Sequence, residues 1–326
     1  MAARASLDDK LAALRSLRGQ ALTPEQREEV RKRIGNRSNL VVAAAANLAG
    51  ENTLADLAGD LEAAFDRFLV DPIRDDKLCR AKIAIVEALD KMEHLRTDVF
   101  LKAARHVQFE PVWAGTEDSA PPLRGAALIA LARIEGPGCV ALLTDAMADP
   151  AKDVRIAAAL ALGAVGSDAA ALVLRLKVRI GDKDPDVLSE CLGALLTTNP
   201  GEGLGIVAEH LDPLRPATCE AAALALGKSR LAEALGPLVR CWERPHQAEL
   251  GRQILLSIAM LRRPAAIEYL KGLVATGAEP TAIAALAALA IHKHDPRLRE
   301  QVAGLVRERG SPPIQARFDH DFRPVD

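Results

Sequence analysis

The stretch from Asp149 to Gly163 reads Asp-Pro-Ala-Lys-Asp-Val-Arg-Ile-Ala-Ala-Ala-Leu-Ala-Leu-Gly and contains the pattern that decides the fold. Asp149-Pro150 ends one helix because proline cannot continue it, and Asp153 is placed to cap the next helix. Val154-Arg155 then leads into a run of small apolar residues in which we expect Leu160 to be buried. Small side chains let helix backbones approach closely, so the stretch predicts a helix packed on other helices.

The same pattern returns four times toward the C-terminus. Arg155 aligns with positions 188, 219, 251 and 282, in steps of 33, 31, 32 and 31 residues. Second helices are expected between these runs, over 168–180, 203–211, 233–242, 265–274 and 297–309. Such a period is typical of stacked helical hairpins, because one hairpin cannot bury its apolar face alone. Strand patterns are absent. The sequence therefore predicts an all-α fold without a sheet, a right-handed α-solenoid of stacked helix hairpins.

The motif Asp-x-Val-Arg, followed by an Ala/Leu run that closes on Leu-Gly, resembles the HEAT-like repeats first associated with phycobilin lyases, which are armadillo-like α-solenoids. The resemblance covers residues 123–310 well and residues 1–122 less regularly. It implies a ladder in which an acid caps one helix and a base reaches a neighbouring repeat. Only Arg124 and Arg155 keep the basic position, which is lost at Leu188, Cys219, Gly251 and Ala282. We expect one continuous solenoid over 1–310 and a C-terminal tail over 311–326.

Bulk composition excludes several classes of protein. With 42 basic and 44 acidic residues the net charge is −2, so the positive excess of a nucleic-acid-binding protein is missing. The five cysteines form no C-x-x-C pair and are interpreted as free thiols in a reducing compartment. Because no stretch of about 18 uncharged apolar residues occurs and the first residues do not resemble a signal peptide, we expect a cytoplasmic protein without a membrane span.

The sequence contains none of the catalytic motifs expected of enzymes with this kind of fold. The His-Glu pairs of deoxyhypusine hydroxylase, closely spaced cysteines for an iron-sulfur cluster, the Gly-x-Ser-x-Gly motif and the P-loop are all missing. His292 and His294 lie beside Asp295 at a helix end, but their spacing puts the rings on different faces. We therefore predict no catalytic residue, no metal site and no cofactor.

The repeat pattern breaks between Lys82 and Arg124, which occupy matching repeat positions but are 42 residues apart, about ten more than one repeat needs. The excess falls in the segment 106–122, whose prolines rule out a regular helix. It holds Phe109 and Trp113 in a chain with only 3% aromatic residues. One hypothesis is a binding site with an apolar part and a rim of polar contacts, formed by Trp113, Phe109, His106, Gln108, Glu110 and Arg105. The alternative is that the two aromatic side chains pack the loop back onto neighbouring helices.

These patterns predict a non-enzymatic scaffold that binds a protein or peptide along the concave face and the irregular loop 106–122. A bilin or tetrapyrrole lyase-like or carrier protein is the alternative that the resemblance implies. The tail 311–326, with Phe318 and Phe322, either caps the last repeat or reaches another subunit to form a homo-oligomer.

Overall fold

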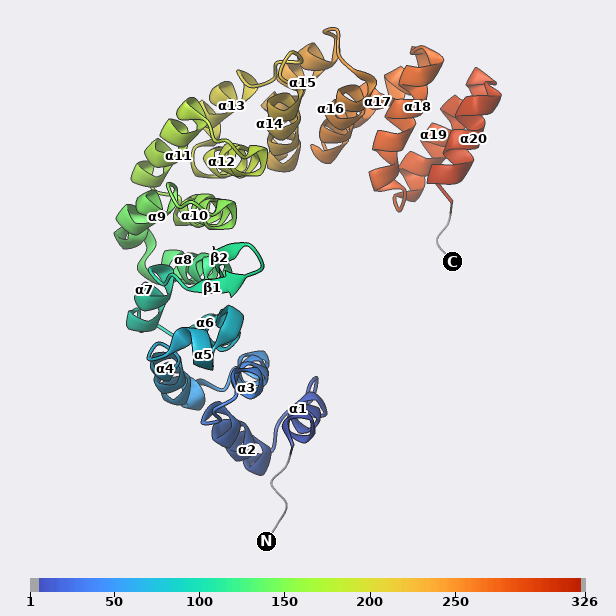
Figure 1. Cartoon of the computed structure of the whole chain (residues 1–326). Helices are drawn as coiled ribbons and strands as arrows, with labels where there is room; N and C mark the ends of the chain where they lie inside the picture. The colour runs from blue at the N-terminus through green and yellow to red at the C-terminus, as the bar shows by residue number, and fades with distance from the viewer. Residues whose placement is uncertain (1–5, 324–326) are drawn as a thin grey trace. The chain divides into compact units, whose positions relative to one another are not determined.

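The computed structural model describes residues 6–323, and its contacts divide the chain into two compact units, residues 1–165 and 166–326. Figure 1 shows the helices in chain order. The helices and strands of the first unit are α1 (Leu7–Arg15), α2 (Pro24–Ile34), α3 (Asn39–Glu51), α4 (Ala58–Arg67), α5 (Pro72–Asp75), α6 (Arg80–Lys91), α7 (Asp98–Ala104), β1 (Phe109–Val112), β2 (Gly115–Asp118), α8 (Pro121–Glu135), α9 (Val140–Ala146) and α10 (Lys152–Val165).

The second unit consists of helices throughout its described part. They are α11 (Asp168–Ile180), α12 (Pro185–Thr198), α13 (Pro200–Ala208), α14 (Pro216–Ser229), α15 (Leu235–Trp242), α16 (Ala248–Met260), α17 (Pro264–Thr276), α18 (Glu279–Leu289), α19 (Pro296–Arg309) and α20 (Pro312–Asp321). Short 3-10 turns lie at Ala55–Leu57, Lys77–Cys79, Gly136–Cys139, Ala232–Ala234 and Ala290–His292.

Each unit is a stack of helical hairpins in two layers. In the first unit α3, α6, α8 and α10 pack on one another in chain order, and in the second unit α12, α14, α16, α18 and α20 do the same. Their contact faces are rich in alanine and leucine, and these side chains form the buried core. Helices α2, α4, α7 and α9 of the first unit and α11, α13, α15, α17 and α19 of the second form the second layer against them. The predicted all-α solenoid is confirmed.

The ends of several helices follow local rules. The Thr23 hydroxyl accepts a hydrogen bond from the Gln26 backbone N–H, and the Gln26 side chain accepts one from the Thr23 backbone N–H. These two bonds form the capping box that the sequence of α2 predicts. Helix α10 begins at Lys152, so Asp153 lies in its first turn and not at the cap. An acid in the first turn still favours the helix, because it faces the positive end of the helix dipole.

Residues 312–321 of the predicted tail form helix α20, which packs on α18 and α19. Its Ile314 and Phe318, together with Phe322, are buried, and the rings of Phe318 and Phe322 stack with their centroids 4.9 Å apart. This helix covers the apolar side of the last hairpin, as a capping element of a repeat array must. A single solenoid over 1–310 with a separate tail stays a prediction.

The expectation of a fold without a sheet is wrong at one place. Residues 109–118 form an antiparallel hairpin in which Phe109 pairs with Asp118 and Val112 pairs with Gly115. Residues 107–111 do alternate between apolar and polar side chains, but Pro111 lies within the run and the buried members are the polar Gln108 and Glu110, so the segment does not have the apolar buried face by which strands are recognised.

The expectation that Leu160 is buried is also wrong, since 44% of this residue is exposed. Leu162, two residues further along α10, is fully buried. In a helix two such positions lie about 200° apart, so only one of them can face the core. The continuous apolar run of α10 gave no sign of which one it is.

This pair of leucines provides a test of the packing. Leu162→Ala removes a fully buried side chain and should lower the free energy of unfolding by about 2 to 5 kcal/mol. Leu160→Ala, in the same helix, is the matched control and should change it by less than about 1 kcal/mol, because an exposed side chain leaves no cavity. Equal losses in urea unfolding would show that the two faces of α10 are assigned wrongly.

Candidate functional site

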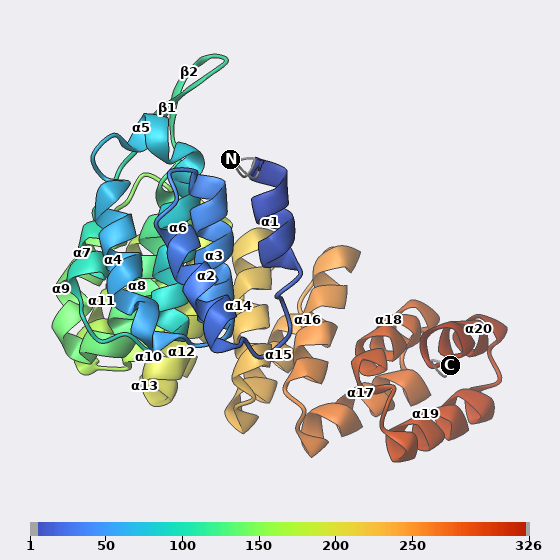
Figure 2. The ribbon, with the colours of Figure 1, turned by 90° about the horizontal axis from the view of Figure 1, so that it is seen from below.

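The extra residues between the repeats of α6 and α8 form a protruding β-hairpin. Trp113 and Ala114 make its two-residue turn, because Val112 and Gly115 on either side are paired. Gly115 has a φ of +136°, which a residue with a side chain rarely adopts. Figure 2 shows both strands extending beyond the ends of the neighbouring helices of the first unit.

The aromatic side chains of the hairpin stand in solvent. Trp113 is fully exposed at 104%, Phe109 is 58% exposed, and Val112 beside them is exposed as well. The alternative in which Phe109 and Trp113 pack the loop back onto neighbouring helices is therefore wrong. The sequence correctly located an unusual segment, but its apolar side chains point outward.

The polar residues expected at the rim separate into two groups. Arg105 is exposed and His106 is half-buried. Gln108 and Glu110, however, are only 2% and 3% exposed. Their burial corrects the expectation that they form part of an open rim. In a strand successive side chains alternate between faces, and here the inward face carries the two polar residues.

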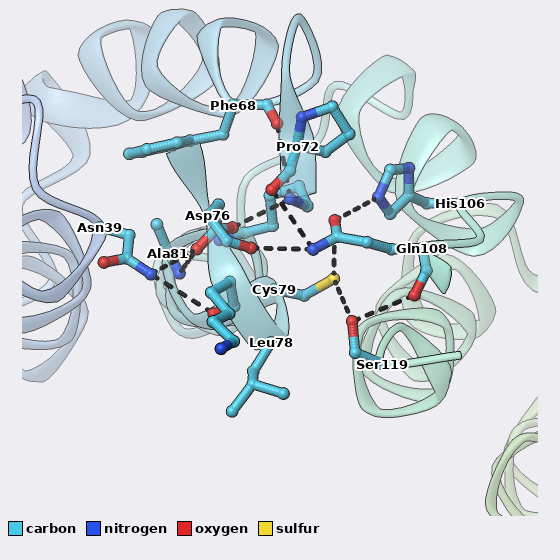
Figure 3. Close-up of polar contacts among 12 residues, drawn as sticks. Asn39, Phe68, Pro72, Asp76, Leu78, Cys79, Ala81, His106, Gln108 and Ser119 are labelled. Atoms are coloured by element: carbon cyan, nitrogen blue, oxygen red, sulfur yellow. Dashed lines mark hydrogen bonds and ion pairs between the residues drawn. The ribbon is translucent and has the colours of Figure 1, made fainter. Parts of the chain in front are cut away.

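Gln108 joins the hairpin to the turn before α6 (Figure 3). Its amide nitrogen donates to the backbone oxygens of Asp76 and Pro72, at 2.9 and 3.3 Å. Its amide oxygen accepts from the Cys79 thiol at 3.3 Å and lies 3.1 Å from Nε2 of His106. A buried side chain with this many partners is held in one position.

Glu110 is the second anchor. Its Oε1 accepts from the Leu78 backbone N–H at 2.6 Å, from the Ser119 hydroxyl at 2.6 Å and from the Gln108 amide at 2.8 Å. Burial raises the pKa of this carboxyl, but the hydrogen bonds from Ser119, Leu78 and Gln108 outweigh it and lower the pKa below its usual value. Its Oε2 is buried and has no hydrogen-bond partner among the described residues.

The turn that these anchors hold has an unusual backbone. Leu78 and Cys79 are successive non-glycine residues in the left-handed region, with φ of 60° and 54°. Each such residue costs on the order of 1 kcal/mol or more and persists only where its surroundings fix it. Asp76, fully buried, provides part of that support, since its carboxylate accepts from the N–H groups of Ala81 and Lys82 and pairs with the Lys82 ammonium at 3.0 Å.

The sequence analysis did not assign Asp76, Cys79 or Ser119 to the site. The irregular spacing before Arg124 was the available signal, because an insertion in a repeat must satisfy its own backbone groups within the fold. It did not indicate that the polar partners would come from the turn before α6.

Arg124 in α8 fixes both ends of the hairpin. Its guanidinium binds both carboxylate oxygens of Asp149 at 3.0 Å, the Asp118 carboxylate at 2.7 Å and the His106 carbonyl at 3.0 Å. Burial lowers the pKa of Arg124, but the hydrogen bonds to Asp149 and Asp118 outweigh this effect. The net result is a raised pKa, so the charged form of the guanidinium is stabilised. Asp149 precedes α10, so the base reaches the neighbouring repeat, as the HEAT-like resemblance implies.

The titratable groups beneath the hairpin are poorly suited to catalysis. Burial raises the pKa of the Cys79 thiol to about 11, so the thiol is protonated at neutral pH and is a weak nucleophile. Burial likewise lowers the pKa of His106, which keeps its ring neutral. Within residues 6–323 no three His, Cys, Asp or Glu side chains gather to hold a metal ion. None of the described helices is long and apolar enough to cross a membrane.

Comparison with known proteins agrees with this architecture. A family model described as HEAT repeats matches residues 110–195, which include most of the hairpin and helices α8 to α11. Residues 110–195 are therefore similar to HEAT repeats. No curated protein matches the sequence at a significant level.

Three solved structures resemble the chain over most of its length. The complex of CpcE and CpcF of phycocyanin lyase from Nostoc sp. PCC7120 is 20% identical, with 90% of this chain and 96% of that chain covered and a TM-score of 0.36. Human deoxyhypusine hydroxylase is 17% identical, covers 90% and 92%, and has a TM-score of 0.30. An engineered protein is 15% identical, covers 98% and 95%, and has a TM-score of 0.41.

The anchoring role of Glu110 predicts a pH-dependent loss of stability. Glu110→Gln should lower the free energy of unfolding at pH 7 by about 1 to 3 kcal/mol, because a neutral amide replaces a charged acceptor. The pKa of Glu110 is lowered by folding, so the carboxylate stabilises the native state above its unfolded pKa of about 4.3, and this is lost as the pH falls through the folded pKa.

The difference between wild type and variant should accordingly shrink when urea unfolding is repeated at decreasing pH. Glu117→Gln is the matched control, since Glu117 pairs with Glu110 across the hairpin but is exposed. A Glu110→Gln deficit that stays constant down to pH 3, or an equal deficit for Glu117→Gln, would contradict the anchoring role.

Proposed function

We propose that this HEAT-repeat protein is a non-enzymatic interaction module that docks on a protein partner through the tip of the hairpin, with Trp113 as the anchor. The observation that carries the proposal is the full exposure of Trp113 on a hairpin whose base is fixed by buried Gln108, Glu110 and Arg124. Tryptophan is enriched among residues that dominate protein interfaces.

The rigid base of the hairpin favours binding. A tip that is already ordered loses little conformational entropy when it docks, so more of the contact energy appears as affinity. Val112 enlarges the apolar tip, while exposed Phe109 lies at the base of the hairpin together with Arg105 and half-buried His106. Gln108 and Glu110 act as positioning residues, because they are buried beneath the hairpin.

The concave face of the repeats remains part of the proposal as a second contact surface for an extended partner, since stacked repeats leave such a face open. The alternative, a bilin or tetrapyrrole lyase-like or carrier protein, needs a pocket that encloses most of its ligand. Exposed Trp113 at a protruding tip and exposed Phe109 at the base of the same hairpin favour protein docking over that role. Absorption spectra after mixing the purified protein with bilins test the alternative directly.

Replacing Trp113 should abolish binding of the partner without changing the stability of the fold. Trp113→Ala should leave the melting temperature within about 2 °C of wild type, because a fully exposed side chain contributes little to stability, and should abolish capture of the partner. The measurement is quantitative mass spectrometry of proteins retained from cell extract, followed by titration of the purified partner.

The matched control is Leu214→Ala, which removes another strongly exposed apolar side chain outside the hairpin. It should retain every protein that the wild type retains. If Trp113→Ala captured the same proteins as wild type, the hairpin would not be the docking element; a large fall in its melting temperature would show that Trp113 stabilises the fold.

A further inference from the structure

The second unit contains a pocket of about 630 Å³, a volume within the range of sites that bind ligands or side chains. Its floor consists of Ile283, Ala284 and Ala287 on one side of α18, and Trp242 forms a wall at the end of α15. Arg252 of α16 and Arg317 of α20 line it with their charged side chains. Small apolar side chains on the floor thus leave room for a large side chain from outside.

Gly251 accounts for the aromatic wall. It occupies the repeat position that Arg155 holds in the first unit, and it lies where a Cβ atom would come within 2.8 Å of Trp242 and 2.5 Å of His246. The rings of Trp242 and His246 are 4.7 Å apart. The missing side chain therefore allows both rings to lie against α16, and the repeat pattern is broken at the pocket itself.

The charges of the pocket favour an acidic occupant. Arg252 pairs with Glu249 and Arg317 pairs with Asp321, each within its own helix, and both guanidinium groups keep substantial exposure. The Arg252–Glu249 pair is exposed on both sides, and such pairs contribute about 0 to 1 kcal/mol, so a carboxylate from a partner can compete for the Arg252 guanidinium. Glu279, the one acid among the lining residues, bonds to the Ser311 hydroxyl at 2.8 Å. Two cations thus face one anion around the pocket.

The hairpin of the same chain has the complementary chemistry. Residues 109–118 contain three acids and no basic residue, and they present exposed Trp113 at their tip. Glu117 is exposed and has no ion-pair partner among the described residues. Glu110 and Asp118 are bound at the base of the hairpin, so Glu117 is its exposed acid. A hairpin with an aromatic anchor, an exposed carboxylate and no base matches a pocket with an aromatic wall and two guanidinium groups in charge and in the kind of side chain.

We propose that the hairpin tip of one copy of this chain docks in the pocket of a second copy, with Trp113 above Ala284 and beside Trp242 and with Glu117 toward the two guanidinium groups. The inference rests on the proposed function of the hairpin and adds that the partner is the chain itself. The two surfaces differ, so the contact is head-to-tail, and each added copy leaves a free tip and a free pocket. A contact between one hairpin tip and one pocket is small, and interfaces below about 1,200 Å² in total are typical of weak association.

Sedimentation velocity of the full chain over a wide range of concentration tests the proposal. The average mass of the wild type should rise steadily with concentration without stopping at the dimer. Trp113→Ala should weaken association by at least about tenfold, the effect of losing an interface anchor. Ala284→Glu, which fills the pocket and places a negative charge in it, should do the same from the other surface.

Two matched controls, Leu214→Ala and Ala316→Glu on the exposed side of α20, should associate as the wild type does. Circular dichroism of every variant confirms that it is folded. The decisive sample mixes Trp113→Ala with Ala284→Glu: one supplies an intact pocket and the other an intact tip, so the mixture should form one-to-one pairs that grow no further.

A wild type that stays monomeric at every concentration overturns the proposal, and so does a mixture that forms no pairs. Association that Trp113→Ala weakens but Ala284→Glu does not would overturn the pocket as the docking site. If the wild type is monomeric and Trp113→Ala still loses a captured protein, self-association is wrong while the proposed function of the hairpin stands.

Discussion

The first unit depends on the buried guanidinium of Arg124. It binds the Asp149 carboxylate with two hydrogen bonds, and it also binds Asp118 and the His106 carbonyl. One side chain thus joins the start of the hairpin, the end of the hairpin and the next repeat. A buried cation that loses one such partner typically costs about 3 to 5 kcal/mol, so these positions constrain one another. The hairpin can leave the helical stack because both of its ends are held at this point.

The polar network below the hairpin explains how an exposed tip can be rigid. Gln108 and Glu110 turn inward and satisfy the backbone of the strained turn at Leu78 and Cys79, while the residues between and beyond them turn outward. Because side chains alternate along the strand, those on the inner face hold the hairpin in place and those on the outer face are free to contact a partner. Since the network is almost fully satisfied, it specifies a single arrangement of the hairpin.

The sequence predicted the repeats well, because alanine-rich helices with punctuation at a regular period have few other ways to bury their faces. It also predicted where the pattern would break, since Lys82 and Arg124 are too far apart for one repeat. The structure of the insertion was beyond such reasoning. Glu110 is buried although glutamate is normally exposed, and only the tertiary contacts with Leu78 and Ser119 make its burial favourable.

The two units differ in the charge of the residue at the repeat position of Arg155. In the first unit this position is basic, and Arg124 uses it to bind acids across repeats. In the second unit it is occupied by Leu188, Cys219, Gly251 and Ala282, which are buried without a charge. Cys219 there packs against Cys241, with their sulfur atoms 3.5 Å apart.

Losing the charged side chain has a physical consequence at each of these positions. A leucine, a cysteine or an alanine fills the space with apolar atoms, so the helices pack directly on one another. Glycine leaves the space open, and at position 251 the rings of Trp242 and His246 enter it and form the wall of a pocket. The same repeat position therefore supports a projecting hairpin at Arg124 and a recess at Gly251, which are the two shapes that a head-to-tail contact requires.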